Sequence, residues 1–278
     1  MIRRRPLLAV FAAAVLGWLS WPAGAAEPLR VGVAPHSSAR MVLEMYQPLR
    51  QALEAELGQP VEIQTAPDFT EFARRALAGE YDVAITTGHQ ARLLQTDAGY
   101  LPLVTYAGTF RAVVVAAKDA PVRKAQDLSG KTVIGLSPTS LVTQWGLHWL
   151  ARNHVADAHV RYVSAADSVA RLILGGEAVA GFMSTANVVG LAPELRARLE
   201  HAVESEPMLG RVYMLNPTRA ALRGAILTAL TRFGGSEAGR AYFTRNKLEG
   251  YRAVGAAELE AMDPFAAEVR AQLSAEAR

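Results

Sequence analysis

The chain has 278 residues, 51% of them hydrophobic and 20% charged, a composition that excludes an intrinsically disordered protein. It contains no cysteine, which excludes disulfides, thiolate metal sites and a lipid anchor on an N-terminal cysteine. The net charge of +3 depends on Arg3, Arg4 and Arg5; without these three, 26 basic residues face 26 acidic ones, so the charge predicts no nucleic-acid partner.

The first 26 residues have the pattern of a secretory signal peptide. Three arginines precede an uncharged stretch, Pro6–Ala26, that ends in small residues. Its apolar core, Leu7–Leu19, is shorter than the about 20 residues of a membrane span, although an uncleaved anchor is the alternative. We expect cleavage near Ala25 or Ala26, by the Sec or the twin-arginine route, and a soluble monomer in a Gram-negative periplasm.

Short β-branched runs follow, each bounded by Gly, Pro or polar residues. They predict strands at Val31–Val33, Val61–Ile63, Val83–Ile85, Val113–Ala116, Thr132–Ile134, Val160–Val163, Val179–Phe182 and Val212–Leu215.

Helical patterns fill the gaps between these runs. Apolar residues recur every three or four positions from Val42 to Leu57, and Pro48 should kink or break this helix before Gly58 ends it. Further helices are expected over 140–152 and 167–174. From Pro217 onward the pattern is all-helical, with a break at 234–235 and an amphipathic stretch over 256–273.

The alternation of strands and helices predicts an α/β fold with mainly parallel sheets and helices on both faces. No linker-like segment separates the two α/β halves. We therefore expect two doubly wound lobes joined by crossing strands, with a helical C-terminal segment.

Enzyme signatures are missing from the sequence. There is no G-x-S-x-G elbow, P-loop, G-x-G-x-x-G or H-E-x-x-H motif. The six histidines have no metal-ligand spacing: His36, His89, His148, His154, His159 and His201. We expect no catalytic residue, no metal and no cofactor.

Hydroxyl side chains gather where strands are predicted to end. Ser137-Pro138-Thr139-Ser140 opens a helix whose first turn contains Thr143, so backbone N–H groups and hydroxyls form a potential anion site. Helix capping is the alternative role. Thr86-Thr87-Gly88-His89 follows the strand Val83–Ile85, and in α/β sheets ligands bind beyond the carboxyl ends of strands. Turn formation is the alternative there.

A series of short motifs resembles the periplasmic phosphate/phosphite/phosphonate-binding proteins of ABC importers, which have the type II periplasmic binding protein fold. The motifs are Val31-Gly32-Val33-Ala34-Pro35, Gln47-Pro48-Leu49, Ala66-Pro67-Asp68-Phe69, Tyr81-Asp82-Val83-Ala84, Asp127-Leu128-Ser129-Gly130-Lys131-Thr132 and Gly239-Arg240-Ala241-Tyr242-Phe243. Their order and spacing extend over nearly the whole chain after the signal peptide.

The resemblance implies a set of ligand-binding residues. Phe69 is expected to pack against the ligand, and Thr86 and His89 to contact its oxygens; Thr87 is expected to join them because of its place after the strand. The family's Ser-Thr-Ser-Gly helix start is only partly kept, because Ser140 is followed by Leu141, Val142 and Thr143. We expect Thr139 and Thr143 to compensate, and Ser137 to belong to the same anion site.

Two positions differ from the family in the part of the site that would bind the amine of an aminoalkyl phosphonate. Relatives that bind aminoalkyl phosphonates have carboxylates where this chain has Ala186 and Arg211. A buried arginine repels an ammonium group, so we expect a compact anion instead. Phosphate, phosphite, an alkyl phosphonate and other oxyanions all stay open.

The same resemblance implies that residues 27–111 and 211–278 form lobe I and residues 112–210 form lobe II. Closure of the lobes about a hinge should bury the ligand, which is then delivered to an ABC permease in the inner membrane. The alternative is a periplasmic ligand sensor that signals to a membrane histidine kinase.

Overall fold

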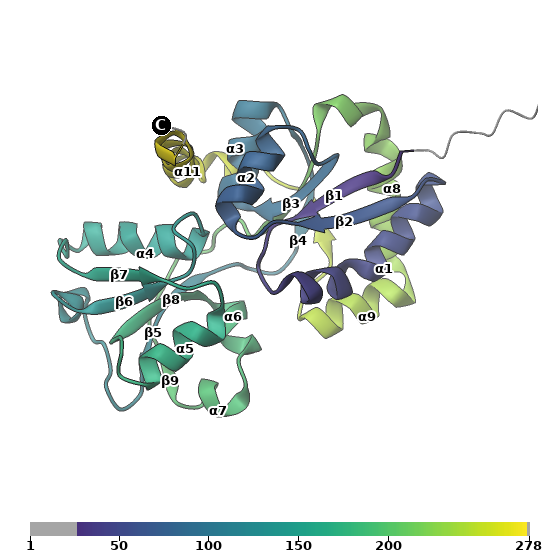
Figure 1. Cartoon of the computed structure of the whole chain (residues 1–278). Coiled ribbons are helices and arrows are strands. Elements are labelled where there is room, and N and C mark those ends of the chain that lie inside the picture. The colour runs from purple at the N-terminus through teal and green to yellow at the C-terminus, as the bar shows by residue number, and fades with distance from the viewer. Residues whose placement is uncertain (1–26, 277–278) are drawn as a thin grey trace, which may run out of the picture.

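A computed structural model describes residues 27–276, so the predicted signal peptide lies outside the described residues. Two sheets form the centres of two lobes (Figure 1), as the strand and helix pattern predicted. Within residues 27–276, no helix combines the length and the apolar character needed to cross a membrane.

Lobe I surrounds a six-stranded sheet of order β11-β4-β10-β3-β1-β2. Alternate residues of each strand face opposite layers of helices, because side chains alternate across a strand. Val83 and Ile85 pack with α1, α8 and α9, whereas Ala84 packs with α2, α3 and α10. The elements are β1 (Leu29–Val33), α1 (Ala39–Leu57), β2 (Val61–Thr65), α2 (Phe69–Leu77), β3 (Val83–Thr87), α3 (Gly88–Ala98), β4 (Leu101–Tyr106), β10 (Arg211–Leu215), α8 (Arg223–Gly235), α9 (Glu237–Asn246), β11 (Tyr251–Arg252) and α10 (Ala256–Glu260).

Lobe II surrounds a five-stranded sheet of order β7-β6-β8-β5-β9. Strand β5 is buried on both faces: Val114 packs toward α4, and Val113 and Val115 pack toward α5 and α6. The elements are β5 (Ala112–Ala117), β6 (Thr132–Gly135), α4 (Leu141–Arg152), β7 (His159–Tyr162), α5 (Ala166–Leu174), β8 (Ala180–Ser184), α6 (Thr185–Gly190), α7 (Pro193–Arg196) and β9 (Leu199–Glu204).

The expectation of mainly parallel sheets is wrong in part. Strands β1, β2 and β3 are parallel, as are β6, β7 and β8, but β10 and β5 run antiparallel to their neighbours. The reason is topological: β5 and β10 follow the segments in which the chain crosses between the lobes. Phe110 and Met208, one in each crossing segment, form an antiparallel bridge.

Three local expectations also differ from the structure. The helix α1 continues through Pro48 without the break allowed for there, with Tyr46, Leu49 and Leu53 buried along one face. Strands β4, β9 and β11 were not predicted. The C-terminal stretch is two helices, α10 and α11 (Asp263–Glu276), and α11 contacts α3 of lobe I and α4 of lobe II.

Gly146 allows α4 to lie close to β8. A Cβ atom at this position would lie 2.4 Å from the buried ring of Phe182. We therefore expect Gly146→Ala to lower the free energy of unfolding by about 1 to 3 kcal/mol, measured by chemical denaturation. Gly224→Ala is the matched control, because this exposed position in α8 has nothing within 4 Å of the added Cβ. Equal stabilities of the two variants would contradict this account of the packing.

Candidate functional site

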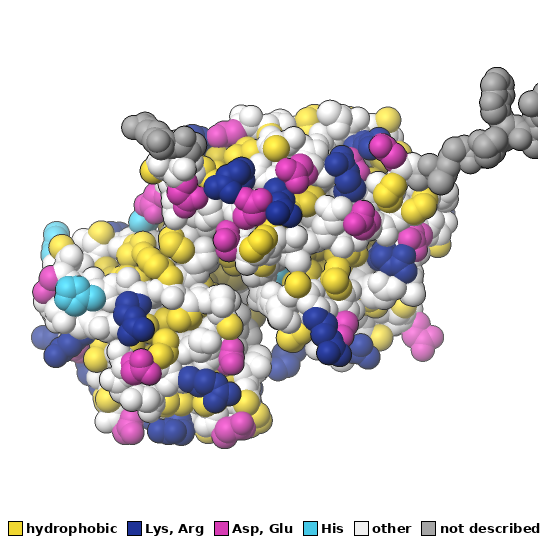
Figure 2. Space-filling view, viewed as in Figure 1, with side chains coloured by type: hydrophobic (Ala, Val, Ile, Leu, Met, Phe, Trp, Pro, Cys, Tyr) yellow, Lys and Arg dark blue, Asp and Glu magenta, His cyan; other side chains and the backbone are white. Residues whose placement is uncertain are grey.

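The cleft between the lobes lies at the carboxyl ends of the parallel strands. In each sheet the first strand of the parallel set lies between the next two, the point where open α/β sheets bind ligands. Segments that follow β1, β2, β6 and β8, together with the last residue of β3, line a cavity of about 1230 Å³ between the lobes. Figure 2 shows the hollow between the lobes, with acidic and basic side chains interspersed on the surrounding surface.

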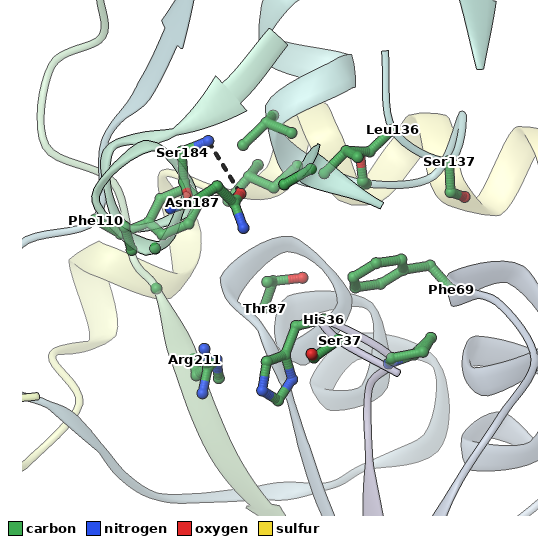
Figure 3. A pocket seen from close by; sticks show the side chains of 18 of the residues that line it. His36, Ser37, Phe69, Thr87, Phe110, Leu136, Ser137, Ser184, Asn187 and Arg211 are labelled. Atoms are coloured by element: carbon green, nitrogen blue, oxygen red, sulfur yellow. Dashed lines mark hydrogen bonds between the residues drawn. The ribbon is translucent and has the colours of Figure 1, made fainter. Parts of the chain in front are cut away.

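Five of the predicted site residues line this cavity: Phe69, Thr87, Ser137, Ser140 and Arg211. Figure 3 shows Ser137 on the lobe II side, and Phe69, Thr87 and Arg211 on the lobe I side. The structure therefore brings together residues that are far apart in the sequence.

The other four predicted residues do not line the cavity. Thr86, His89, Thr139 and Thr143 have fully buried side chains. Thr86 donates a hydrogen bond to Gln90, and Thr143 accepts one from Ser140. These side chains support the cavity wall from behind, because direct contact with a ligand requires exposure to the cleft.

His89 connects the two lobes. Its Nε2 donates to the carbonyl oxygen of Thr139 at 2.9 Å, and its Nδ1 lies 3.0 Å from the hydroxyl of Thr87. Burial lowers the pKa of His89 to about 4, although the hydrogen bond to Thr139 opposes this shift. The imidazole is therefore neutral at neutral pH.

Arg211 carries the positive charge deep in the cavity. It is the first residue of β10 and pairs in register with Thr87, so both side chains emerge on the same face of the sheet. Its guanidinium donates to the hydroxyl of Tyr46 at 3.3 Å and lies 5.9 Å from the ring centre of Tyr106. Within residues 27–276, no carboxylate lies within salt-bridge distance of it; the charge is held by neutral groups.

Acidic residues lie at the rim of the cavity. Four are exposed, and the fifth, Glu71, is paired with Arg74 and Arg75. The five are Glu44, Asp68, Glu71, Glu249 and Glu276. The inner wall is thus positive and polar, which suits a small anion.

Sequence reasoning missed several polar residues of the cavity, above all Asn187 and His36. Ser184 donates to Asn187 Oδ1 from both its backbone and its side chain, which leaves the amide NH₂ of Asn187 directed into the pocket (Figure 3). His36 follows β1, and burial first, then the charge of Arg211, lowers its pKa to about 3. Both residues follow predicted strands, so the carboxyl-end rule could have found them.

The histidine in α4 has a structural contact with the C-terminal helix. His148 forms a pair with Glu268 and stacks on Phe265, with ring centres 4.9 Å apart. Within the described part of the chain, no group of three or more His, Asp or Glu side chains is arranged to hold a metal ion.

Comparison with known families gives a match over residues 31–259 to the family described as ABC transporter, phosphonate, periplasmic substrate-binding protein. The chain belongs to this family. Membership supports transport over the sensor role, and it gives the chain a periplasmic location, a small-molecule ligand and a membrane permease as partner. No curated protein matches the sequence at a significant level.

Solved structures of this fold are similar over nearly their whole length. PhnD1 from Prochlorococcus marinus, in complex with methylphosphonate, has a TM-score of 0.76 at 10% identity, covering 87% of this chain and 98% of that one. XAC2383 from Xanthomonas citri, bound to chloride, has a TM-score of 0.74 at 19% identity, covering 88% and 99%. A binding protein of an ABC phosphonate transporter from Pseudomonas aeruginosa has a TM-score of 0.72 at 15% identity, covering 90% and 99%. These likenesses establish the two-lobed fold.

We expect alanine substitutions of Ser140 and Thr143 to have different effects on ligand affinity. Ser140 lines the cavity and caps α4, whereas Thr143 lies behind it. Ser140→Ala should weaken oxyanion binding by about 1.5 to 3 kcal/mol, the cost of a lost hydrogen bond to a charged group, and stability by about 1 kcal/mol. Thr143→Ala should lower stability with little change in affinity. Calorimetry and thermal denaturation measure both effects, and an unchanged affinity in Ser140→Ala would assign it to capping alone.

Proposed function

We propose that this chain captures a compact oxyanion, of the phosphate, phosphite or alkyl phosphonate class, and delivers it to an ABC permease without chemical change. The observation that carries the proposal is Arg211, a cation in the inner cavity with neutral partners only. A charge removed from water without a counter-ion is costly. An anionic ligand supplies that counter-ion.

Both lobes contribute donors to the proposed ligand. Arg211 extends from lobe I, and the NH₂ of Asn187 faces it from lobe II (Figure 3). Ser137 adds a hydroxyl near the start of α4, where backbone N–H groups and the helix dipole favour negative charge. The hydroxyl of Ser140, which donates to Thr143, would turn from Thr143 to donate to the ligand. Phe69 supplies an apolar contact for the part of the ligand that carries no oxygen.

The ligand should be an anion without an ammonium group. Ala186 and Arg211 occupy the positions where an amine-binding relative would have acidic residues, and both line the cavity. The acidic residues of the cavity lie at its rim and are mostly exposed. An ammonium group in the inner cavity would meet Arg211 without a compensating carboxylate.

Ligand binding should close the lobes about the two crossing segments, residues 107–111 and 205–210. Phe110 and Met208 pair there. A ligand held by both lobes favours the closed form and stabilises the folded protein against unfolding, by about 2.7 kcal/mol at a concentration one hundred times Kd. We propose that the exported protein is a monomer that begins near Ala26 or Glu27, after removal of the signal peptide.

The test is a panel of oxyanions against the processed protein. Phosphate, phosphite, methylphosphonate, sulfate and 2-aminoethylphosphonate are compared by thermal shift and calorimetry. We expect a raised melting temperature and a smaller radius of gyration with at least one phosphorus oxyanion, and weak binding of the aminophosphonate. Absence of binding by every phosphorus oxyanion would refute the proposed function. Mass spectrometry of the periplasmic protein tests the cleavage site.

A further inference from the structure

The hydroxyl of Thr87 lies in a hydrogen-bond chain whose direction is set by a backbone carbonyl. The carbonyl oxygen of Thr139 can only accept, so His89 Nε2, 2.9 Å away, carries the proton of the neutral ring. His89 Nδ1 is then an acceptor. The Thr87 hydroxyl lies 3.0 Å from this nitrogen and donates its proton to it.

The consequence concerns what Thr87 offers to a ligand. A hydroxyl has one proton, and that of Thr87 points away from the cavity toward His89. Its oxygen can still accept. Rotation of the hydroxyl toward a ligand oxygen would leave His89 Nδ1 without a donor inside the protein, and an unsatisfied buried acceptor is costly.

Arg211 lies beside this acceptor. The two residues are paired in register on β10 and β3, and both line the cavity. Arg211 favours a negative ligand oxygen, whereas an oxygen that forms a hydrogen bond with Thr87 must bear a proton. An oxyanion with one protonated oxygen satisfies both residues together.

A second acceptor lies on the same wall. His36 directs its Nδ1 to the carbonyl oxygen of Ala34 at 2.9 Å, so the ring proton is on Nδ1 and Nε2 has a lone pair. No residue within 27–276 donates to this buried Nε2. His36 and Arg211 are side by side in Figure 3. The lobe I wall thus combines one fixed cation with two neutral acceptors.

From this arrangement, and resting on the proposed function, we infer that the site selects the singly protonated form of its oxyanion, with Thr87 as the residue that accepts the ligand proton. Sulfate, which has no proton at neutral pH, and fully deprotonated phosphonates should then bind less tightly than a hydrogen-bearing monoanion. The expected preference is about ten- to a hundredfold, the equivalent of one unsatisfied buried acceptor.

The pH dependence of ligand affinity should reflect the ionisation of the ligand and not that of the residues that line the cavity. Among the described residues, Arg211 of β10 pairs in register with Thr87, His89 of α3 forms a hydrogen bond with it, and His36 lines the same cavity. Arginine stays charged throughout, and the two histidines have pKa values of about 4 and about 3. Their charge states are therefore constant between about pH 6 and pH 8. Loss of affinity across this range follows the second ionisation of the ligand.

The experiment is calorimetry with methylphosphonate, its monomethyl ester and sulfate from pH 6 to pH 8.5. For the wild type we expect methylphosphonate to weaken as pH rises, the ester to bind at least about tenfold less tightly at pH 6, and sulfate to bind weakly at every pH. Thr87→Val should reduce the preference for methylphosphonate over its ester, whereas Thr87→Ser should retain it. Thr231→Val, an exposed site in α8, is the matched control.

Three results would overturn the inference: methylphosphonate affinity that rises with pH, sulfate that binds as tightly as methylphosphonate, or Thr87→Val that weakens all three probes equally. Nitrogen-15 spectra of the His89 ring add a readout that does not need a ligand, because the proton must be on Nε2. If none of the probes binds at any pH, and phosphate and phosphite also fail to bind, the proposed function fails instead.

Discussion

Replacing Arg211 with Ala is expected to weaken binding of phosphate or phosphite by about 2 to 5 kcal/mol, the range measured when a buried charge loses its partner across an interface. The side chain lines the inner cavity and has Tyr46 and Tyr106 as its neighbours. Arg211→Glu should abolish anion binding, since a second negative charge then faces the ligand. Arg211→Lys should retain part of the affinity, because the charge remains but the forked donors are lost.

The free energy of unfolding of Arg211→Ala distinguishes a role of Arg211 in ligand binding from a role in folding. Among the described residues, Arg211 forms no ion pair with a carboxylate that Arg211→Ala would break. The free energy of unfolding of this variant without ligand should therefore equal or exceed that of the wild type. The control is Arg240→Ala, at an exposed position in α9. Calorimetry of all four variants against phosphate, phosphite and 2-aminoethylphosphonate decides the matter. Unchanged affinities in Arg211→Ala, or tight binding of the aminophosphonate by the wild type, would contradict the role of this charge.

The largest effect on stability is expected at Asp82. Its side chain is 2% exposed and accepts hydrogen bonds from the backbone of Arg30 and the guanidinium of Arg219, both at 2.8 Å. The carboxylate thus ties β1 and the segment after β10 to the start of β3. Asp82→Ala removes two hydrogen bonds to a buried carboxylate, each worth about 1.5 to 3 kcal/mol, and should cost about 3 to 5 kcal/mol, measured by chemical denaturation.

The matched control is Asp263→Ala. Asp263 also pairs with an arginine, Arg92, but its side chain is 56% exposed. Surface ion pairs contribute about 0 to 1 kcal/mol, so the control should be nearly neutral. Similar losses in both variants would show that the burial of Asp82 does not set its contribution.

Acidification gives an independent check on Asp82. Burial raises the pKa of its carboxyl, but the hydrogen bonds from Arg219 and Arg30 outweigh burial and hold the pKa below its ordinary value of 3.8. A carboxyl with a lowered pKa in the folded state stabilises the protein above its unfolded pKa. This contribution is lost as pH falls through the lower, folded value. Asp82→Ala should therefore lose less stability than the wild type on acidification below about pH 4.

Most of the fold could be predicted because buried strands of this type have a local signature. The apolar runs of β3 and β5 are buried on both faces, and such runs are visible in sequence. Strands β4, β9 and β11 lack that signature: β4 contains Pro102, β9 has partly exposed charged residues, and β11 has two residues. These strands form because a neighbouring strand is present.

The site was predictable only to the level of its loops. The rule that ligands bind beyond the carboxyl ends of parallel strands located the segments 86–89 and 137–140. It could not predict that Thr87 and not Thr86, or Ser140 and not Thr143, lines the cavity. These neighbouring hydroxyl residues differ in the direction in which their side chains point. It also left out Asn187, whose orientation depends on its hydrogen bonds with Ser184.

The sequence by itself determined the alternation of strands and helices and the two α/β halves. Only the tertiary structure decided that Arg211 pairs with Thr87 across two strands and that neutral groups surround its charge. The physical reason is the range of the interactions. Backbone propensity and hydrophobic period act over a few residues, whereas register, burial and the direction of a hydroxyl proton depend on segments distant in the chain, such as Thr139 and His89.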